Sequence, residues 1–295
     1  MPKVFKIGIT KNKNQKIREV EEISVSAGEG IIGDRYFNES TEDRNQLTLI
    51  ESENIDYYNQ KFNLKIPYLN FRRNIVTKDI KLNELMKIAE PYKMENYINI
   101  ISDDFEWDTN WKLLTENFME GYHLPVAHPE TVGPFINVMD TEFDKRGSFK
   151  SFTYQYFTKN RDAPVGTAHP ENNSLKGKWR HTSILPTVFP SHMYSLAPDH
   201  YWYLSLLPSG VGKVKIRFGA AIAPEVLNNQ NNPDKYIKDT RNFLYKVQEE
   251  DRYVVEGIYK GVNSPLGKPG PLSWLERENH EFTQYIARML TALIL

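Results

Sequence analysis

The order of apolar and polar positions in the first 90 residues predicts a β-rich region. Two short apolar runs, Leu47–Ile50 and Asn74–Thr77, are separated by clusters of turn-forming residues, which is typical of strands. Between these runs we expect one short helix over Glu51–Phe62. Three glycines fall within six residues, beginning at Gly28, which indicates tight turns or a close approach of backbone segments.

The pattern changes further along the chain, where a helix with one apolar stripe is predicted. Apolar residues from Trp111 to Tyr122 recur at spacings of three and four, so we expect a helix over Asn110–Tyr122. Pro125 should end this helix, because proline cannot continue the backbone hydrogen-bond ladder.

Strands and two more helices are expected in the remaining sequence. Residues 147–157 and 180–223 read as strands. Asp234 is a suitable N-cap for a long helix that reaches about Lys260, and a last helix is expected over about Trp274–Ala292. The chain as a whole therefore predicts an α+β fold.

A domain boundary is predicted near Pro91. Tryptophan occurs only from Trp107 onward, and all seven histidines lie beyond position 120. We therefore expect one domain at residues 1–90 and a second at residues 91–295.

Composition and charge exclude several classes of protein. Hydrophobic residues make up 40% and charged residues 25%, which is ordinary for a globular protein. The net charge of −1 gives no support for nucleic-acid binding. No apolar run reaches the roughly 18 residues of a membrane span, and the first residues do not resemble a secretion signal. We expect a cytoplasmic protein.

The chain contains no cysteine. This excludes disulfides, zinc–thiolate sites, cysteine-bound iron–sulfur clusters and thiol nucleophiles within it. Any metal ion must therefore be bound by histidine, aspartate, glutamate or backbone oxygen.

Two histidines, His123 and His128, lie five residues apart at the end of the predicted helix. On an unbroken helix their side chains would point about 140° apart, too far to share one ion. Pro125 lies between them and breaks the helix, so the chain can turn back and bring both rings together. The alternative is a histidine-rich helix terminus in which imidazolium interacts with the helix dipole.

A carboxylate on a core-facing stripe is the second signal. In the predicted helix from Asp234, Asp251 falls on the same stripe as Phe243, Val247 and Val254. A charge that faces the core is costly unless it is paired or binds a metal ion. Asp251 could pair with Arg252; with the two histidines it would instead complete the two-histidine, one-carboxylate triad of non-haem Fe(II) oxygenases.

Three segments together resemble the catalytic domain of the alpha subunit of Rieske-type ring-hydroxylating oxygenases. Asn110–His128 is similar to the iron motif of that family, and Glu249–Gly261 resembles the segment with its carboxylate ligand. Pro269–Tyr285 is similar to its closing segment. The pieces occur in the family's order, and the resemblance covers about residues 92–295.

This resemblance implies an Fe(II) ion held by His123, His128 and Asp251. It also implies a helix-grip-like domain, with an antiparallel sheet and long helices, and a homo-oligomer that is a trimer. Glu120 stands where the family has an acid that relays electrons and protons between subunits. Asn117 matches a family asparagine near the iron.

The departure from the family concerns the electron supply. Family members hold a [2Fe–2S] cluster in an N-terminal Rieske domain, whereas this chain has no cysteine and no histidine before His123. We therefore expect no such cluster in the chain. Electrons would come from an external donor, which could be a reductase, a ferredoxin or a separate Rieske protein.

The first 90 residues resemble the beginning of a MOSC domain, a β-barrel family linked to molybdenum-cofactor and sulfur handling. The similarity lies in three pieces, Gly30–Tyr36, Asn45–Glu53 and Arg72–Leu85. It implies a small partial β-barrel. Without the cysteine that the family associates with sulfur transfer, we expect neither that activity nor a bound molybdenum cofactor.

Aromatic residues in the predicted strands are candidates for the substrate pocket. Tyr194, Trp202 and Tyr203 could form a cage that binds a methylated ammonium cation by cation–π attraction. The alternative is that alternating aromatic residues simply fill the sheet. His200 has no second partner at ligand spacing, so we expect it to be structural or part of the pocket wall.

The leading interpretation is a non-haem Fe(II) oxidoreductase of the mono- or dioxygenase type. It would use O₂ and external electrons to hydroxylate or N-demethylate a small organic substrate, either aromatic or a quaternary ammonium compound. Two alternatives remain open: a non-catalytic fusion that acts as a binding or assembly module, and a molybdenum-cofactor-binding MOSC protein.

Overall fold

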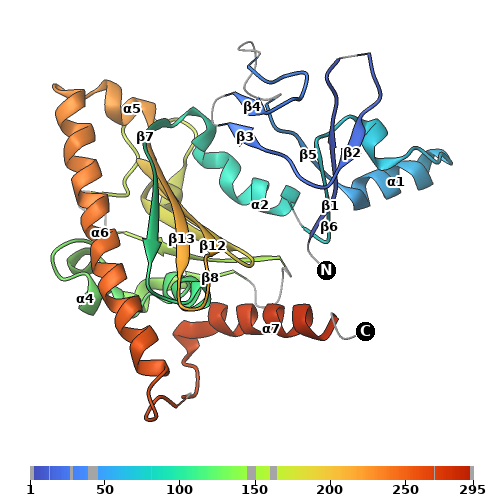
Figure 1. Ribbon diagram of the computed structural model, residues 1–295. Coiled ribbons are helices and arrows are strands. Elements are labelled where there is room, and N and C mark those ends of the chain that lie inside the picture. Colours follow the sequence, from blue (N-terminus) through green and yellow to red (C-terminus); the bar gives the residue numbers. More distant parts are fainter. Residues whose placement is uncertain are drawn as a thin grey trace. The chain divides into compact units, whose positions relative to one another are not determined.

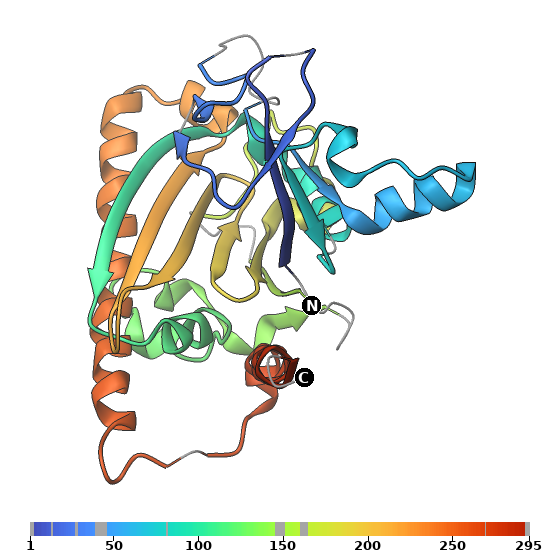
Figure 2. The same cartoon turned by 45° about the vertical axis from the view of Figure 1, so that its right-hand side comes forward.

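The chain divides into two compact units, Met1–Asn83 and Glu84–Leu295 (Figures 1 and 2). This is the division in a computed structural model, which describes residues 3–12, 14–26, 29–38, 46–80, 82–144, 151–159, 165–268 and 270–292. The boundary expected from the sequence lay near Pro91, a few residues later. Each unit is described by itself.

The first unit is built on a four-stranded sheet in the order β2-β1-β6-β5. Its strands are β1 (Lys3–Ile9), β2 (Arg18–Val20), β5 (Leu49–Glu51) and β6 (Ile75–Lys78). Helix α1 (Ser52–Phe62) and the short 3₁₀ helix η2 (Tyr68–Phe71) connect β5 to β6. Because of this crossover, β5 and β6 are parallel, whereas β1 is antiparallel to β2 and to β6. The strands and the helix predicted here are confirmed.

A small core and tight turns complete this unit. Ile31, Ile55 and Val76 are fully buried, and a two-stranded pair joins β3 (Val25–Ser26) to β4 (Gly30–Ile31). Gly30 and Gly33 have positive φ angles, as the glycine cluster predicted, while Gly28 lies outside the described residues. The partial β-barrel implied by the resemblance corresponds, within the described residues, to an open sheet.

The second unit contains a seven-stranded antiparallel sheet in the order β7-β13-β12-β11-β10-β9-β8. The strands are β7 (Ile98–Trp107), β8 (Thr141–Phe143), β9 (Phe152–Thr158), β10 (Thr182–Val188), β11 (His192–Leu196), β12 (His200–Pro208) and β13 (Val214–Ile222). This mixture of a large antiparallel sheet and helices confirms the predicted fold class.

The second unit also contains helices, most of them after the first strand of the sheet. They are α2 (Leu82–Ala89), α3 (Trp111–Phe118), α4 (Leu124–Ala127), α5 (Pro224–Asn228), α6 (Pro233–Val262) and α7 (Arg277–Ala292). Short 3₁₀ helices are η3 (Glu90–Tyr92), η4 (Met94–Asn96), η5 (Gly133–Phe135), η6 (Val138–Asp140), η7 (Gly177–His181) and η8 (Trp274–Glu276). Figure 1 shows α6 running alongside β7 and β13.

The strand period of two sorts side chains onto the two faces of the sheet. On β12, Trp202 and Leu204 belong to the core that also contains Leu114 of α3 and Leu244 of α6. Tyr203, between them in sequence, belongs to a separate core on the opposite face. The helices that bear the candidate donors therefore cover the Trp202 face.

Helix α3 is shorter than predicted, and its end is the first local correction. It stops at Phe118, not Tyr122, so the break comes before His123 and Pro125 does not cause it. Gly121 follows the break, and an added Cβ there would lie 3.0 Å from the ring of Phe157. Pro125 instead lies in the first turn of α4, where its missing N–H costs nothing.

Helix α6 begins slightly earlier than predicted. Its N-cap is Asn232, whose side chain accepts a hydrogen bond from the backbone N–H of Lys235 at 3.0 Å. The buried face of the helix runs through Leu244 and Val255, whereas Ile258, near the C-terminal end of the helix, is exposed. No helix of the described residues is long and apolar enough to cross a lipid bilayer.

Candidate metal centre

The break between α3 and α4 places both histidines at the ends of a single helical turn. His123 is the N-cap of α4, and His128 is its C-cap. The backbone N–H of His128 donates to the carbonyl of Leu124 at 3.1 Å, which closes the turn. Both rings therefore face the same point, as the sequence analysis expected, although a different residue ends the first helix.

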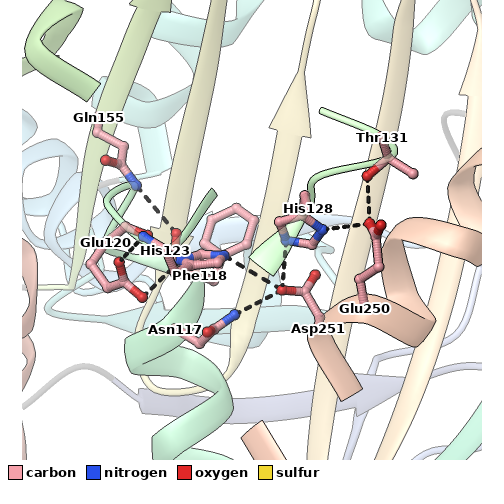
Figure 3. A network of polar contacts seen from close by, with 9 residues as sticks. All are labelled: Asn117, Phe118, Glu120, His123, His128, Thr131, Gln155, Glu250 and Asp251. Carbon is pink, nitrogen blue, oxygen red and sulfur yellow. Dashed lines mark hydrogen bonds and ion pairs between the residues drawn. The ribbon is translucent and has the colours of Figure 1, made fainter. Parts of the chain in front are cut away.

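Asp251, on α6, lies at that point (Figure 3). Its Oδ1 atom is 3.1 Å from Nε2 of His128 and 3.5 Å from Nε2 of His123. The three donor atoms lie within 4.8 Å of one another. Two ligands at right angles around an octahedral ion, each at about 2.1 Å, lie about 3 Å apart. The donor set and its spacing therefore fit a metal ion bound by two nitrogens and one carboxylate.

The other ring nitrogens face two further carboxylates. Nδ1 of His123 lies 2.7 Å from Oε1 of Glu120, and Nδ1 of His128 lies 2.9 Å from Oε2 of Glu250. A carboxylate at Nδ1 holds the proton on that nitrogen, which leaves Nε2 free to act as a ligand. Figure 3 shows both arrangements, one on each side of Asp251.

Asn117 positions the carboxylate of the triad. Its Nδ2 donates to Oδ1 of Asp251 at 3.0 Å, and its side chain comes from the last turn of α3. The alternative partner considered for Asp251, Arg252, instead interacts with Glu256 at 2.8 Å. Asp251 is thus held by the two histidines and one amide, not by a neighbouring base.

Burial and hydrogen bonding act in opposite directions on the titration of this cluster. Burial by itself would raise the pKa of Asp251, but hydrogen bonds to His123 and His128 outweigh it and lower that pKa to about 2. Burial would lower the pKa of His123, yet its hydrogen bonds to Asp251 and Glu120 raise it to about 10. Protons therefore hold the cluster together without an ion, and a divalent cation would replace them.

Glu250 is the main residue of the cluster that sequence reasoning missed. It directly precedes Asp251, and successive helical residues point about 100° apart. Nothing in the sequence indicates that His128 lies between them. The hydroxyl of Thr131 donates to the same Oε2 atom, which shows that Glu250 is held in place from two directions.

A cavity of about 120 Å³ lies beside the candidate donors. Both histidines, Asp251, Asn117 and Glu120 contribute to its wall. Apolar side chains form much of the remainder, and they include Leu114, Phe118, Phe135, Phe157, Leu185, Trp202, Leu204, Phe243 and Val247. The cluster is therefore open to a small enclosed space of mostly apolar character.

The expected aromatic cage is not assembled around this cavity. Trp202 lines it, but Tyr194 and Tyr203 do not. These two tyrosines are paired in register and lie on the other face of the sheet, where Tyr201 also packs. The reason is the strand period of two, which sends Tyr203 away from the face that Trp202 occupies.

Comparisons with known proteins place most of the second unit in one family. The family described as "Ring hydroxylating alpha subunit (catalytic domain)" matches residues 94–292. A search of curated protein sequences finds no match. The family match begins after the first unit, so the MOSC-like resemblance of residues 1–90 is not supported by it and stays a prediction.

Two solved structures are similar in fold. The quaternary ammonium Rieske monooxygenase CntA with an inhibitor is 16% identical, with a TM-score of 0.52, and the match covers 70% of this chain and 52% of that one. Naphthalene 1,2-dioxygenase from Rhodococcus sp. bound to indole is 15% identical, with a TM-score of 0.53, covering 74% and 65%. This chain thus spans about half the length of the first of these proteins.

Proposed function

We propose that this chain, which belongs to the ring-hydroxylating alpha-subunit family through its catalytic domain, is an oxygenase. Its second unit would hydroxylate or N-demethylate a small organic substrate, using O₂ and electrons from an external donor. The observation that supports this most directly is the cluster of His123, His128 and Asp251 on the wall of an enclosed, mostly apolar cavity.

The three donors of the cluster would hold Fe(II). When bound there, the ion supplies the redox chemistry for O₂, and three protein ligands leave its other coordination positions open. With the ion bound, the Nδ1 partners of the histidines would hold the remaining proton on Nδ1, and Asn117, which donates to Asp251, would fix its rotamer. The apolar wall excludes water from the reacting centre.

Glu120 would relay electrons and protons to the centre, as the family resemblance implies. Its side chain is nearly buried, contacts Nδ1 of His123 at 2.7 Å and accepts a hydrogen bond from the backbone N–H of His123 at 3.1 Å. Burial raises the pKa of Glu120, and the contact with His123 opposes that rise. We also propose that the electrons come from an external donor protein and that Glu120 acts within a homotrimer.

The proposal is tested by metal content and oxygen consumption. The protein, loaded anaerobically with Fe(II), should hold one iron per chain, and His123→Ala, His128→Ala and Asp251→Ala should each lose it. His280→Ala is the matched control, because His280 lies on α7 and is not part of the cluster. Retention of iron by all three cluster variants would contradict the assignment.

The electron supply is tested with the same preparation. The protein should lack the visible absorption of an iron–sulfur cluster, because it has no cysteine. Substrate-dependent O₂ uptake should require an added Rieske protein or an artificial reductant. Sustained uptake with NAD(P)H alone would contradict the need for a donor, and iron binding without any uptake would favour the non-catalytic alternative.

A further inference from the structure

One end of the cavity is polar, although most of its wall is apolar. Lys159, Ser183 and His200 all line the cavity. Lys159 directly follows β9, whereas Ser183 lies on β10 and His200 on β12. All three lie on the sheet face that the helices with the candidate metal-binding residues cover. The register of the strands shows where this polar end lies.

The polar end is displaced from the metal cluster along the strands. Gln155 of β9 donates to the carbonyl of Phe118, the residue next to Asn117. Lys159 is four residues further along the same strand direction, which corresponds to about 13 Å. Ser183 is opposite Phe157 in register, and so it lies on the same side.

His200 lies at this end for the same reason. Trp202 packs edge-on against Phe118, with ring centroids 5.7 Å apart. His200 precedes Trp202 by two residues on β12, a strand that runs opposite to β9 through the intervening pairings. The polar end is therefore reached from Phe118 by moving forward along β9 and backward along β12.

Asp199 positions polar groups at this end. Its Oδ1 atom is 2.7 Å from Nδ1 of His200, and its Oδ2 atom accepts a hydrogen bond from the backbone N–H of Gly166 at 2.7 Å. A Cβ built on Gly166 would lie 2.3 Å from Nζ of Lys159, so the ammonium packs directly against this backbone. Asp199 thus directs His200 and attracts Lys159 from one side.

The donors at this end retain hydrogen-bonding capacity. Within the described residues, the hydroxyl of Ser183 is buried without a hydrogen-bond partner. The one hydrogen bond found there for Nζ of Lys159 is a long one, 3.4 Å, to the carbonyl of Val165. Burial lowers the pKa of Lys159, and the nearby charge of Asp199 opposes that shift; an anionic acceptor would likewise favour its charged form. Buried donors of this kind are normally satisfied by an acceptor.

The opposite end of the cavity holds the metal cluster. There the wall presents the carboxylates of Asp251 and Glu120, and the side-chain carbonyl of Gln155 is buried without a partner within the described residues. The side-chain carbonyl of Gln155 is an acceptor and so offers a carboxylate no hydrogen bond at this end. An apolar group would face the cluster through the middle of the cavity.

We propose that the substrate is an elongated molecule with an apolar body and a terminal carboxylate, which Lys159, His200 and Ser183 bind. The carboxylate would accept from the ammonium and from the hydroxyl, and the apolar body would lie against Phe157 and Trp202. This inference rests on the proposed function, because the bound molecule is a substrate only if the protein is an oxygenase. The binding itself does not require iron.

The test compares an acid with its uncharged analogue. Binding of 4-phenylbutyrate and 4-phenylbutyramide to the iron-free full chain is measured by calorimetry. A hydrogen bond to a charged group contributes about 1.5–3 kcal/mol, so the acid should bind about tenfold to a hundredfold more tightly than the amide. Lys159→Met should lose this preference, whereas Lys215→Met, an exposed lysine on β13, should keep it.

Two results would overturn the proposal. One is equal binding of acid and amide to the wild-type protein, or no binding of the acid at millimolar concentration. The other is an unchanged preference in Lys159→Met. The wild-type comparison stands even if the variant does not fold, which a melting curve checks. Because iron content is measured without an organic ligand, and this binding without iron, each proposal can fail alone.

Discussion

Each histidine of the candidate metal centre has one ring nitrogen near Asp251 and the other near a different carboxylate. The distances from Nδ1 are similar, 2.7 Å to Glu120 for His123 and 2.9 Å to Glu250 for His128. The two carboxylates nevertheless come from different elements, one from the segment after α3 and one from α6. Their roles can therefore be separated by substitution.

Glu250→Gln should weaken Fe(II) binding while leaving the fold intact. Glutamine can still accept from Nδ1 of His128, but it lacks the charge that makes the ring a better ligand. Changes next to a metal ligand reduce affinity by about tenfold to a hundredfold, and we expect the lower part of that range. Affinity is measured by anaerobic titration, with Glu249→Gln, an exposed neighbour, as the matched control. Equal affinities of the two variants would show that Glu250 has no positioning role.

Glu120→Gln should separate electron relay from metal binding. The substitution preserves size and one hydrogen bond to His123, so iron affinity should fall by about a hundredfold at most. Turnover driven by an external reductant should fall much further, because the charge near the ring is lost. Iron content and O₂ consumption are measured on the same preparation, and an unaltered turnover rate would contradict the relay.

At the scale of elements, the turn from α4 into η5 determines where His128 points. Gly133 donates its backbone N–H to the carbonyl of His128 at 2.9 Å, which folds the chain back after the second histidine. A Cβ on Gly133 would lie 2.5 Å from that carbonyl oxygen and 2.8 Å from the carbonyl oxygen of Leu124. Only glycine allows this approach without moving the backbone.

Gly133→Ala should therefore destabilise the protein and weaken metal binding together. Overpacking of this kind costs about 1–3 kcal/mol. Gly257→Ala is the matched control, because Gly257 lies inside α6 with open space around its Cα, and alanine there should stabilise by about 0.5–1 kcal/mol. Both values come from urea unfolding. A Gly133→Ala protein as stable as the wild type would show that the turn can relax.

At the scale of the second unit, a buried carboxyl group joins α7 to the sheet. Glu278 is fully buried and accepts a hydrogen bond from the hydroxyl of Thr153 on β9 at 2.8 Å. Burial raises the pKa of Glu278 to about 8, with Thr153 and Arg277 opposing the rise and Glu281 adding to it. The group therefore stays protonated in the folded state at neutral pH, whereas it ionises in the unfolded chain.

This raised pKa predicts a loss of stability as the pH rises. The contribution of Glu278 is fully present below its unfolded pKa of about 4.5, and it declines progressively up to a pH of about 8. Glu278→Gln should remove this part of the pH dependence, so the variant should gain stability relative to the wild type across that range. Free energies of unfolding at several pH values test this, and parallel curves for the two proteins would contradict it.

For the whole molecule, local sequence patterns predicted which segments form helices and strands better than they predicted the residues at which these elements end. The alternation in residues 180–223 and the stripe along α6 depend on the side-chain periods of strands and helices, and these segments formed as expected. The predicted end of α3 was wrong, because the helix stops at Phe118; Gly121, which follows the break, lies against the ring of Phe157 on β9. Proline was the visible signal, but the helix ends before Pro125 is reached.

The sequence by itself determined the chemical types at the candidate site. With no cysteine present, a metal ion could be bound only by nitrogen and oxygen donors, and a core-facing aspartate and two closely spaced histidines were the candidates for these donors. These inferences depend on composition and on short spacings, which need no knowledge of how distant segments meet.

Only the tertiary structure decided which side chains share the cavity. Glu250 contacts His128 across 122 positions of sequence, and the charge of Asp199 acts on Lys159 across a sheet whose register the sequence does not show. The face on which Trp202 lies, opposite to Tyr203, follows from the same register. A shift of one residue in strand pairing would reverse every such assignment, and that pairing is set by the packing of the whole sheet.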